Sequence, residues 1–172
     1  MKIELKKFQF FERMSEETNA FVADVYANGV KIAYAKNDGH GGETFYYPEP
    51  KNAKLLAEAE AYCKSLPPTV YKGQGMGGRD IVIESNLVNV IDDLVCAAIK
   101  AKDDKKLEKK MEKAIMWGVK GGHSYTQVTF GGKLLSQMPK ERLQMYVNEY
   151  KKKLKPNEVF LNTNFERLGI KI

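Results

Sequence analysis

The sequence predicts an α+β fold in which an N-terminal antiparallel β-meander packs with helices, and a helical second half carries a short β-hairpin. Three observations predict it: an Asn28-Gly29 step between two β-rich runs, apolar residues at helical spacing from Leu87 onward, and a length of 172 residues. A chain of this length buries a core without needing disulfides or metals. We therefore expect one domain over residues 1–172, with sub-halves at 1–66 and 80–172.

The N-terminal strands are predicted from turn chemistry and alternation. Asn-Gly adopts positive φ at both central positions of a type I′ turn, so residues 21–27 and 30–35 are expected to form a hairpin. Residues 3–10 add an earlier strand, and residues 43–47 add a later one. The first 48 residues are thus expected to form a meander of three or four strands.

A helix and a loop follow the meander. Pro50 suits the first turn of a helix that ends near Lys64, because proline needs no hydrogen-bond partner for its nitrogen there. The segment YKGQGMGGRD is glycine-rich and predicts a loop, and DIVIE after it predicts a short strand. The two sub-halves are expected to meet near residues 67–79.

The second half begins with a helical pattern. Apolar residues recur at helical spacing from Leu87 to Ile99, are interrupted by KDDKK, and resume until a stop near Gly118. This pattern predicts two helices with a corner at Asp103–Asp104, or one long helix. Trp117 is expected at the end of the helical stretch.

The last third of the chain predicts a hairpin, a helix and a strand. YTQVTF alternates as strands do, and Gly131-Gly132 suits a turn from which KLLSQ returns. Pro139 is expected to begin a helix that runs to about Leu154, and EVFLN after it predicts a final strand.

Charge is unevenly distributed along the chain. The net charge is +6, and the excess lies in two predicted helical regions, residues 100–121 and 140–155. No run of 18 apolar residues is present and the N-terminus lacks a signal-peptide pattern, so no membrane partner and a cytoplasmic location are expected. Cys63 and Cys96 are expected to be buried thiols, because both lie in predicted helices among alanines and leucines. Neither belongs to a Cys-x-x-Cys pair, so a zinc site of the usual spacing is not expected.

The two histidines both lie in glycine-rich segments. His40 is part of NDGHGG and His123 is part of KGGHS. Two imidazoles could share acid and base roles in a phosphoesterase, but histidine is also tolerated in tight turns, so both are only weak catalytic candidates. Asp38 and Glu43 could join His40 at a metal, but three ligands from one short loop would be strained. We therefore predict no metal site and no cofactor.

Phosphate binding is an alternative reading of the basic residues. Lys72 and Arg79 flank the glycine-rich loop at residues 73–80, whose amides could face an anion. Lys106, Lys109 and Lys113 share one face of a predicted helix, which would attract a nucleotide or nucleic acid. Lysine is also the ordinary residue of a solvated helix face, and no aromatic residues interleave with these lysines.

The block SEETNAF, the Asn28-Gly29 turn and NDGHGG together resemble a pattern in uncharacterised small proteins of tailed bacteriophages and related mobile elements. The resemblance covers residues 15–42 and implies expression inside an infected bacterium, as a protein that inhibits or redirects a host or defence component by binding it. It assigns no activity to any residue, and it leaves an oligomer open.

The hairpin also predicts which polar residues gather. Residues 15–19 precede its first strand and residues 37–42 follow its second, so both segments are expected at the same end of the sheet. The predicted binding rim consists of Glu16, Glu17, Asn19, Asn37, Asp38 and His40. The favoured function is that of a non-enzymatic binding protein; a phosphate binder and a histidine-dependent phosphoesterase are the alternatives.

Overall fold

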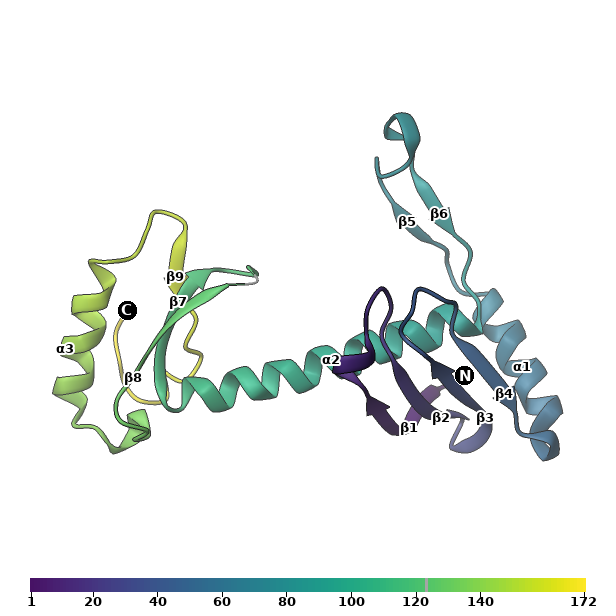
Figure 1. Cartoon of the computed structure of the whole chain (residues 1–172), viewed down its shortest axis with the longest axis horizontal. Helices are drawn as coiled ribbons and strands as arrows, with labels where there is room; N and C mark the ends of the chain where they lie inside the picture. The colour runs from purple at the N-terminus through teal and green to yellow at the C-terminus, as the bar shows by residue number, and fades with distance from the viewer. Residues whose placement is uncertain (123) are drawn as a thin grey trace. The chain divides into compact units, whose positions relative to one another are not determined.

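The computed structural model describes residues 1–122 and 124–172 and has an α+β fold (Figure 1). Its contacts divide the chain into two compact units, Met1–Lys100 and Ala101–Ile172. The division falls within the long helix α2 (Leu87–Met111), whereas the sequence placed the meeting of two sub-halves near residues 67–79. Each unit has its own buried core.

The first unit is built on the predicted meander. The strands β1 (Ile3–Phe10), β2 (Phe21–Ala27), β3 (Val30–Asn37) and β4 (Phe45–Pro48) form a four-stranded antiparallel sheet in sequence order. The β2–β3 turn has φ +48° at Asn28 and +84° at Gly29, as a type I′ turn requires. A 3₁₀ turn, Glu12–Met14, lies between β1 and β2.

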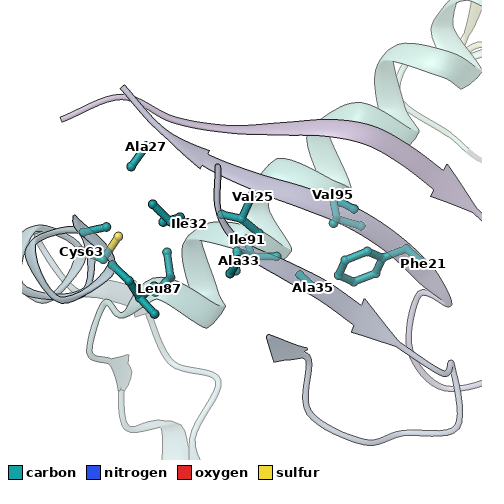
Figure 2. Close-up of a cluster of buried hydrophobic side chains, with 13 residues drawn as sticks. Phe21, Val25, Ala27, Ile32, Ala33, Ala35, Cys63, Leu87, Ile91 and Val95 are labelled. Atoms are coloured by element: carbon teal, nitrogen blue, oxygen red, sulfur yellow. The ribbon is translucent and has the colours of Figure 1, made fainter. Parts of the chain in front are cut away.

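Two helices cover one face of this sheet. A 3₁₀ turn at Pro50–Asn52 leads into α1 (Ala53–Lys64), which the sequence predicted with its start at Pro50. Alternate residues of β2 and β3 pack against α1 and the first part of α2 (Figure 2). The buried side chains of this core include Phe21, Ala23, Val25, Ala33, Ala35, Leu56, Ala59, Cys63, Leu87, Ile91 and Val95.

A separate hairpin connects α1 to α2. Its strands, β5 (Thr69–Tyr71) and β6 (Ile81–Ile83), pair antiparallel, and its turn contains a 3₁₀ segment, Met76–Gly78. The sequence predicted β6 and the glycine-rich loop but not β5. β6 is recognisable from its β-branched run Ile81–Ile83, whereas β5 directly follows two prolines and has no such run of three.

The second unit contains more strand than the sequence predicted. The strands β7 (Ala114–Val119), β8 (Tyr125–Thr129) and β9 (Glu158–Phe160) form a sheet with β7 in the centre. The helix α3 (Lys140–Lys151) starts after Pro139, as predicted. The core of this unit includes Ile115, Trp117, Leu143, Val147, Phe160 and Phe165.

The structure decides one open alternative for this half and overturns two predictions. The corner expected at residues 103–104 is absent, and α2 is one long helix, the alternative that the sequence left open, because its last turns are exposed and tolerate the charged run. Residues 114–118 are strand rather than helix, so Trp117 lies in a strand. The KLLSQ segment contains a 3₁₀ turn, Leu135–Gln137, instead of a returning strand, and β7 pairs with β9 on its other side.

Candidate functional site

Two loops meet at one end of the first unit's sheet: residues 15–20, before β2, and residues 38–44, between β3 and β4. The Gly39 carbonyl oxygen accepts hydrogen bonds from the N–H groups of Glu16, Glu17 and Thr18 at 3.0, 3.1 and 3.3 Å. Gly39 has φ +90°, and a Cβ there would overlap the Met14 carbonyl oxygen, so only glycine permits this approach. The structure therefore brings together the two loops on which the rim prediction depends.

Asn37 joins these loops at their base and is 8% exposed. Its Oδ1 accepts hydrogen bonds from the Thr18 hydroxyl at 2.9 Å and from the Gly39 N–H at 2.8 Å. Its Nδ2 donates to the Gly42 carbonyl at 3.0 Å and to the Thr44 hydroxyl at 3.2 Å. One amide thus uses both ends to fix both loops, which makes Asn37 a positioning residue of the rim.

The charged rim residues lie on the surface. His40 Nδ1 is 3.1 Å from Glu16 Oε2, and both side chains are more than half exposed. Asp38 pairs with Lys36 Nζ at 3.3 Å. The Glu17 carboxylate lies over Gly41, where an added Cβ would overlap it. His123 lies outside the described residues, so a pairing of the two histidines stays a prediction.

A cavity of about 300 Å³ opens beside the loops. Its polar lining includes Glu17, Asn19 and Glu43 from the loops, and its floor includes Phe21. Its far wall belongs to α2, whose residues the sequence reasoning did not connect to this site. The α2 residues that line the cavity are Asp92, Val95 and Cys96.

Asp92 is the least exposed carboxylate of the cavity wall. Its Oδ1 accepts a hydrogen bond from the Thr44 hydroxyl at 2.6 Å, which ties α2 to the β3–β4 loop. Burial raises the pKa of Asp92, and the nearby Asp93 and Glu43 carboxylates raise it further, although the bond from Thr44 acts in the opposite direction. The ionised form of Asp92 is therefore disfavoured in the folded protein.

Cys96 lies one helical turn after Asp92 and corrects a sequence prediction. Cys63 is buried as expected, but Cys96 is exposed. Its sulfur accepts a hydrogen bond from the Asn19 amide at 3.8 Å. Although the residue is exposed, partial burial of its thiol raises the pKa of Cys96, and the Asp92 and Asp93 carboxylates add to that effect. Cys96 is thus an accessible thiol in the cavity wall rather than part of the core.

The glycine-rich loop at residues 73–80 uses its amides internally. The Gly73 N–H donates to the Asp80 carboxylate at 2.9 Å, and the Gly75 N–H donates to the Arg79 carbonyl at 2.7 Å. Lys72 and Arg79 both lie on the exposed hairpin as flanking residues. Because Asp80 occupies an amide that a phosphate would need, the loop is not preorganised for an anion.

The predicted lysine face lies at the end of α2 in the second unit. Lys106 and Lys109 are on the helix, and Lys113 follows it before β7. Lys106 Nζ lies 3.1 Å from Asp103 Oδ1, an i,i+3 pair on an exposed helix surface. These residues have the geometry of a solvated helix face, and they belong to a different unit from Lys72 and Arg79.

Comparison with protein-family models, with curated proteins and with solved structures finds no match. Within residues 1–122 and 124–172, no group of three or more histidine, cysteine or acidic side chains is arranged to hold a metal ion. No described helix is long and apolar enough to span a membrane. The candidate site therefore rests on the geometry of the first unit.

Proposed function

We propose that this chain is a non-enzymatic binding protein whose rim and cavity receive a basic segment of a partner protein. The rim and cavity comprise the loops at residues 15–20 and 38–44 and the α2 residues Asp92, Val95 and Cys96. The observation that carries the proposal is a set of three carboxylates, Glu17, Glu43 and Asp92, around one cavity. Among the described residues, no lysine, arginine or histidine lines it.

A cation from outside would offset the cost of this arrangement. Asp92 is partly buried beside two other acidic groups, which raises its pKa, and a positive charge that approaches it would offset this cost of its ionised form. The hydrogen bonds through Gly39 and Asn37 fix the loops beforehand, which lowers the entropy lost on binding.

The biological context of the proposal extends the resemblance of residues 15–42 to proteins of phages and mobile elements. In that context the partner is a component of the host bacterium or of its defence, which the bound protein inhibits or redirects. A binding protein of this kind acts by occupying its target, so it needs a preformed surface rather than a reactive group.

The test uses capture from bacterial lysate followed by mass spectrometry. The double variant Glu17→Gln, Asp92→Asn should lose the captured partner, whereas Glu58→Gln, Glu84→Gln removes the same charge from exposed positions outside the cavity and should keep it. Because Asp92→Asn removes a disfavoured charge and retains an acceptor for Thr44, loss of folding is not expected. Equal capture by both double variants would refute the proposal.

A second readout reports the cavity directly. Partner binding should slow labelling of the exposed Cys96 thiol by maleimide, with Cys63 as the buried reference. If the captured partner leaves the labelling rate of Cys96 unchanged, it binds elsewhere on the protein.

A further inference from the structure

The face of the first unit's sheet opposite the helices carries aromatic and basic side chains. The strand register places Lys6, Asp24, Tyr34 and Tyr47 in one row across β1 to β4, and Val22, Lys36 and Phe45 in the next. Directly paired residues point to the same face and alternate with the core residues. We call this surface the outer sheet face and define it by Tyr34, Phe45, Tyr47, Lys6, Lys7 and Lys36.

Three rings of the outer sheet face are open to solvent. Tyr34, Phe45 and Tyr47 are 38%, 59% and 53% exposed. The Tyr34 and Tyr47 ring centroids are 6.4 Å apart on neighbouring strands, and Phe45 lies two residues before Tyr47 on the same face of β4. Exposed rings clustered on a sheet are unusual on a solvated surface and are typical of a stacking platform.

Lys6, Lys7, Lys31 and Lys36 lie around these rings, together with the carboxylates of Glu4, Asp24 and Asp38. Asp24 is buried on this face, but Lys31 Nζ and Lys7 Nζ pair with its two oxygens at 2.6 and 3.2 Å. Lys6 Nζ lies 4.1 Å above the Tyr26 ring centroid, and Lys36 pairs in register with Phe45. Two ammonium groups therefore neutralise Asp24. Two further carboxylates near this surface also pair with lysines, Glu4 with Lys2 at 2.8 Å and Asp38 with Lys36 at 3.3 Å.

We propose that the outer sheet face binds single-stranded nucleic acid, with bases stacked on Tyr34, Phe45 and Tyr47 and phosphates held by Lys6, Lys7 and Lys36. Flat rings bordered by ammonium groups complement the two chemical parts of a single strand, its bases and its phosphates. Lys36 already pairs with the exposed Asp38 carboxylate at 3.3 Å, a solvent-screened ion pair that a phosphate can replace. This inference goes beyond the proposed function, because these residues do not line the cavity.

The experiment measures fluorescence anisotropy of labelled thymidine and uridine oligonucleotides of about 12 nucleotides, a length within the site sizes of single-strand binding folds. The full chain should bind at low ionic strength and weaken steeply between about 50 and 200 mM salt. The DNA and RNA arms show which sugar the face accepts. Tyr34→Ala and Tyr47→Ala should each weaken binding at least about fivefold, whereas Tyr34→Phe and Tyr47→Trp keep a ring and should keep most of the affinity.

Controls separate stacking from general charge attraction. Tyr71→Ala removes a ring of similar exposure, 41%, from the β5–β6 hairpin and should leave binding unchanged. Lys36→Gln should lower the salt dependence of binding, and Lys109→Ala on α2 should have little effect on affinity.

Absence of binding by both oligonucleotides at low salt would overturn the proposal. Equal affinity of Tyr34→Ala and the unmodified chain would also overturn it. Circular dichroism and thermal unfolding verify the fold of each variant; if Tyr34→Ala unfolds, Tyr34→Phe and Lys36→Gln carry the test.

Discussion

Asn37→Ala should loosen the candidate site by removing the side chain that fixes both of its loops. The substitution deletes four hydrogen bonds, two accepted and two donated, at a position that is 8% exposed. Each such bond contributes about 0.5–1.5 kcal/mol net. The Gly42 carbonyl and the Thr18 hydroxyl lie near the surface, where water replaces part of the loss, so we expect the first unit to lose about 2–4 kcal/mol.

The rate at which maleimide labels the Cys63 thiol measures this loss of stability within the first unit. Cys63 is fully buried in the first unit's core and reacts only when that core opens, and a Cys96→Ala background removes the exposed thiol. A loss of 2–4 kcal/mol corresponds to roughly 30- to 700-fold faster labelling. Asn37→Asp keeps both acceptor bonds but places a carboxylate oxygen against the Gly42 carbonyl at a buried position, so it should also label faster than the unmodified chain. A change below about twofold for Asn37→Ala would refute the role assigned to this amide.

Three further predictions concern other parts of the structure. Gly39→Ala should destabilise the first unit by at least about 3 kcal/mol in urea unfolding, because the added Cβ meets both an unfavourable positive φ and overlap with the Met14 carbonyl. Gly29→Ala meets only the unfavourable φ and should lose about 1 kcal/mol. Equal losses of stability would contradict the predicted overlap. The hydrogen bond from Lys31 lowers the pKa of Asp24 in the folded protein. The ionised Asp24 therefore stabilises the fold above the ordinary aspartate pKa, and this stabilisation is lost as the pH falls through the lowered pKa. The stability gap between the unmodified chain and Asp24→Asn should therefore shrink from pH 7 to strongly acidic pH, and a constant gap would argue against the ion pairs. Asn162→Ala removes an acceptor for the Met116 N–H at 2.7 Å and a donor to the Ala114 carbonyl at 2.9 Å. Urea unfolding followed by Trp117 fluorescence should show a loss of about 2–4 kcal/mol in stability. An unchanged unfolding midpoint would contradict this role of Asn162.

The N-terminal meander could be predicted because its signals are local. Asn28 and Gly29 adopt the positive φ values that the dipeptide favours, and residues on both sides alternate. The same hairpin made the rim loops predictable. The register pairs Phe21 with Asn37, which places the loop before β2 and the loop after β3 side by side.

The central strand of the second unit could not be recognised in the same way. β7 is buried on both faces over Ala114–Gly118, so it lacks the alternation that marks a half-exposed strand. Met111, Ala114 and Ile115 also continue the helical spacing of α2. Only pairing with β8 and β9, which is not encoded in the local pattern, decides between the two conformations.

The cavity wall was missed for a related reason. Asp92 and Cys96 are four residues apart and therefore lie on one side of α2, next to the buried Ile91 and Val95. The spacing shows that they share a side, but which loop faces that side depends on how the helix packs on the sheet. The polar aspartate beside an apolar stripe is the only sequence signal that could have drawn attention to it.

The two proposed surfaces of the first unit lie mainly on opposite sides of one sheet and touch where Asp38 of the rim pairs with Lys36 of the outer sheet face. On β2, Phe21 points to the helix-covered side and lines the cavity, whereas the next residue, Val22, points to the outer sheet face. An occupant of the cavity meets carboxylates, and an occupant of the outer face meets lysines and rings. Salt weakens both interactions, so ionic strength alone cannot assign a ligand to either surface. Substitution can: Asp92→Asn should leave oligonucleotide affinity nearly unchanged, and Tyr34→Ala should leave partner protection of Cys96 unchanged. If either substitution abolished both interactions, the effect would lie in the shared sheet, and neither surface could be assigned its own ligand.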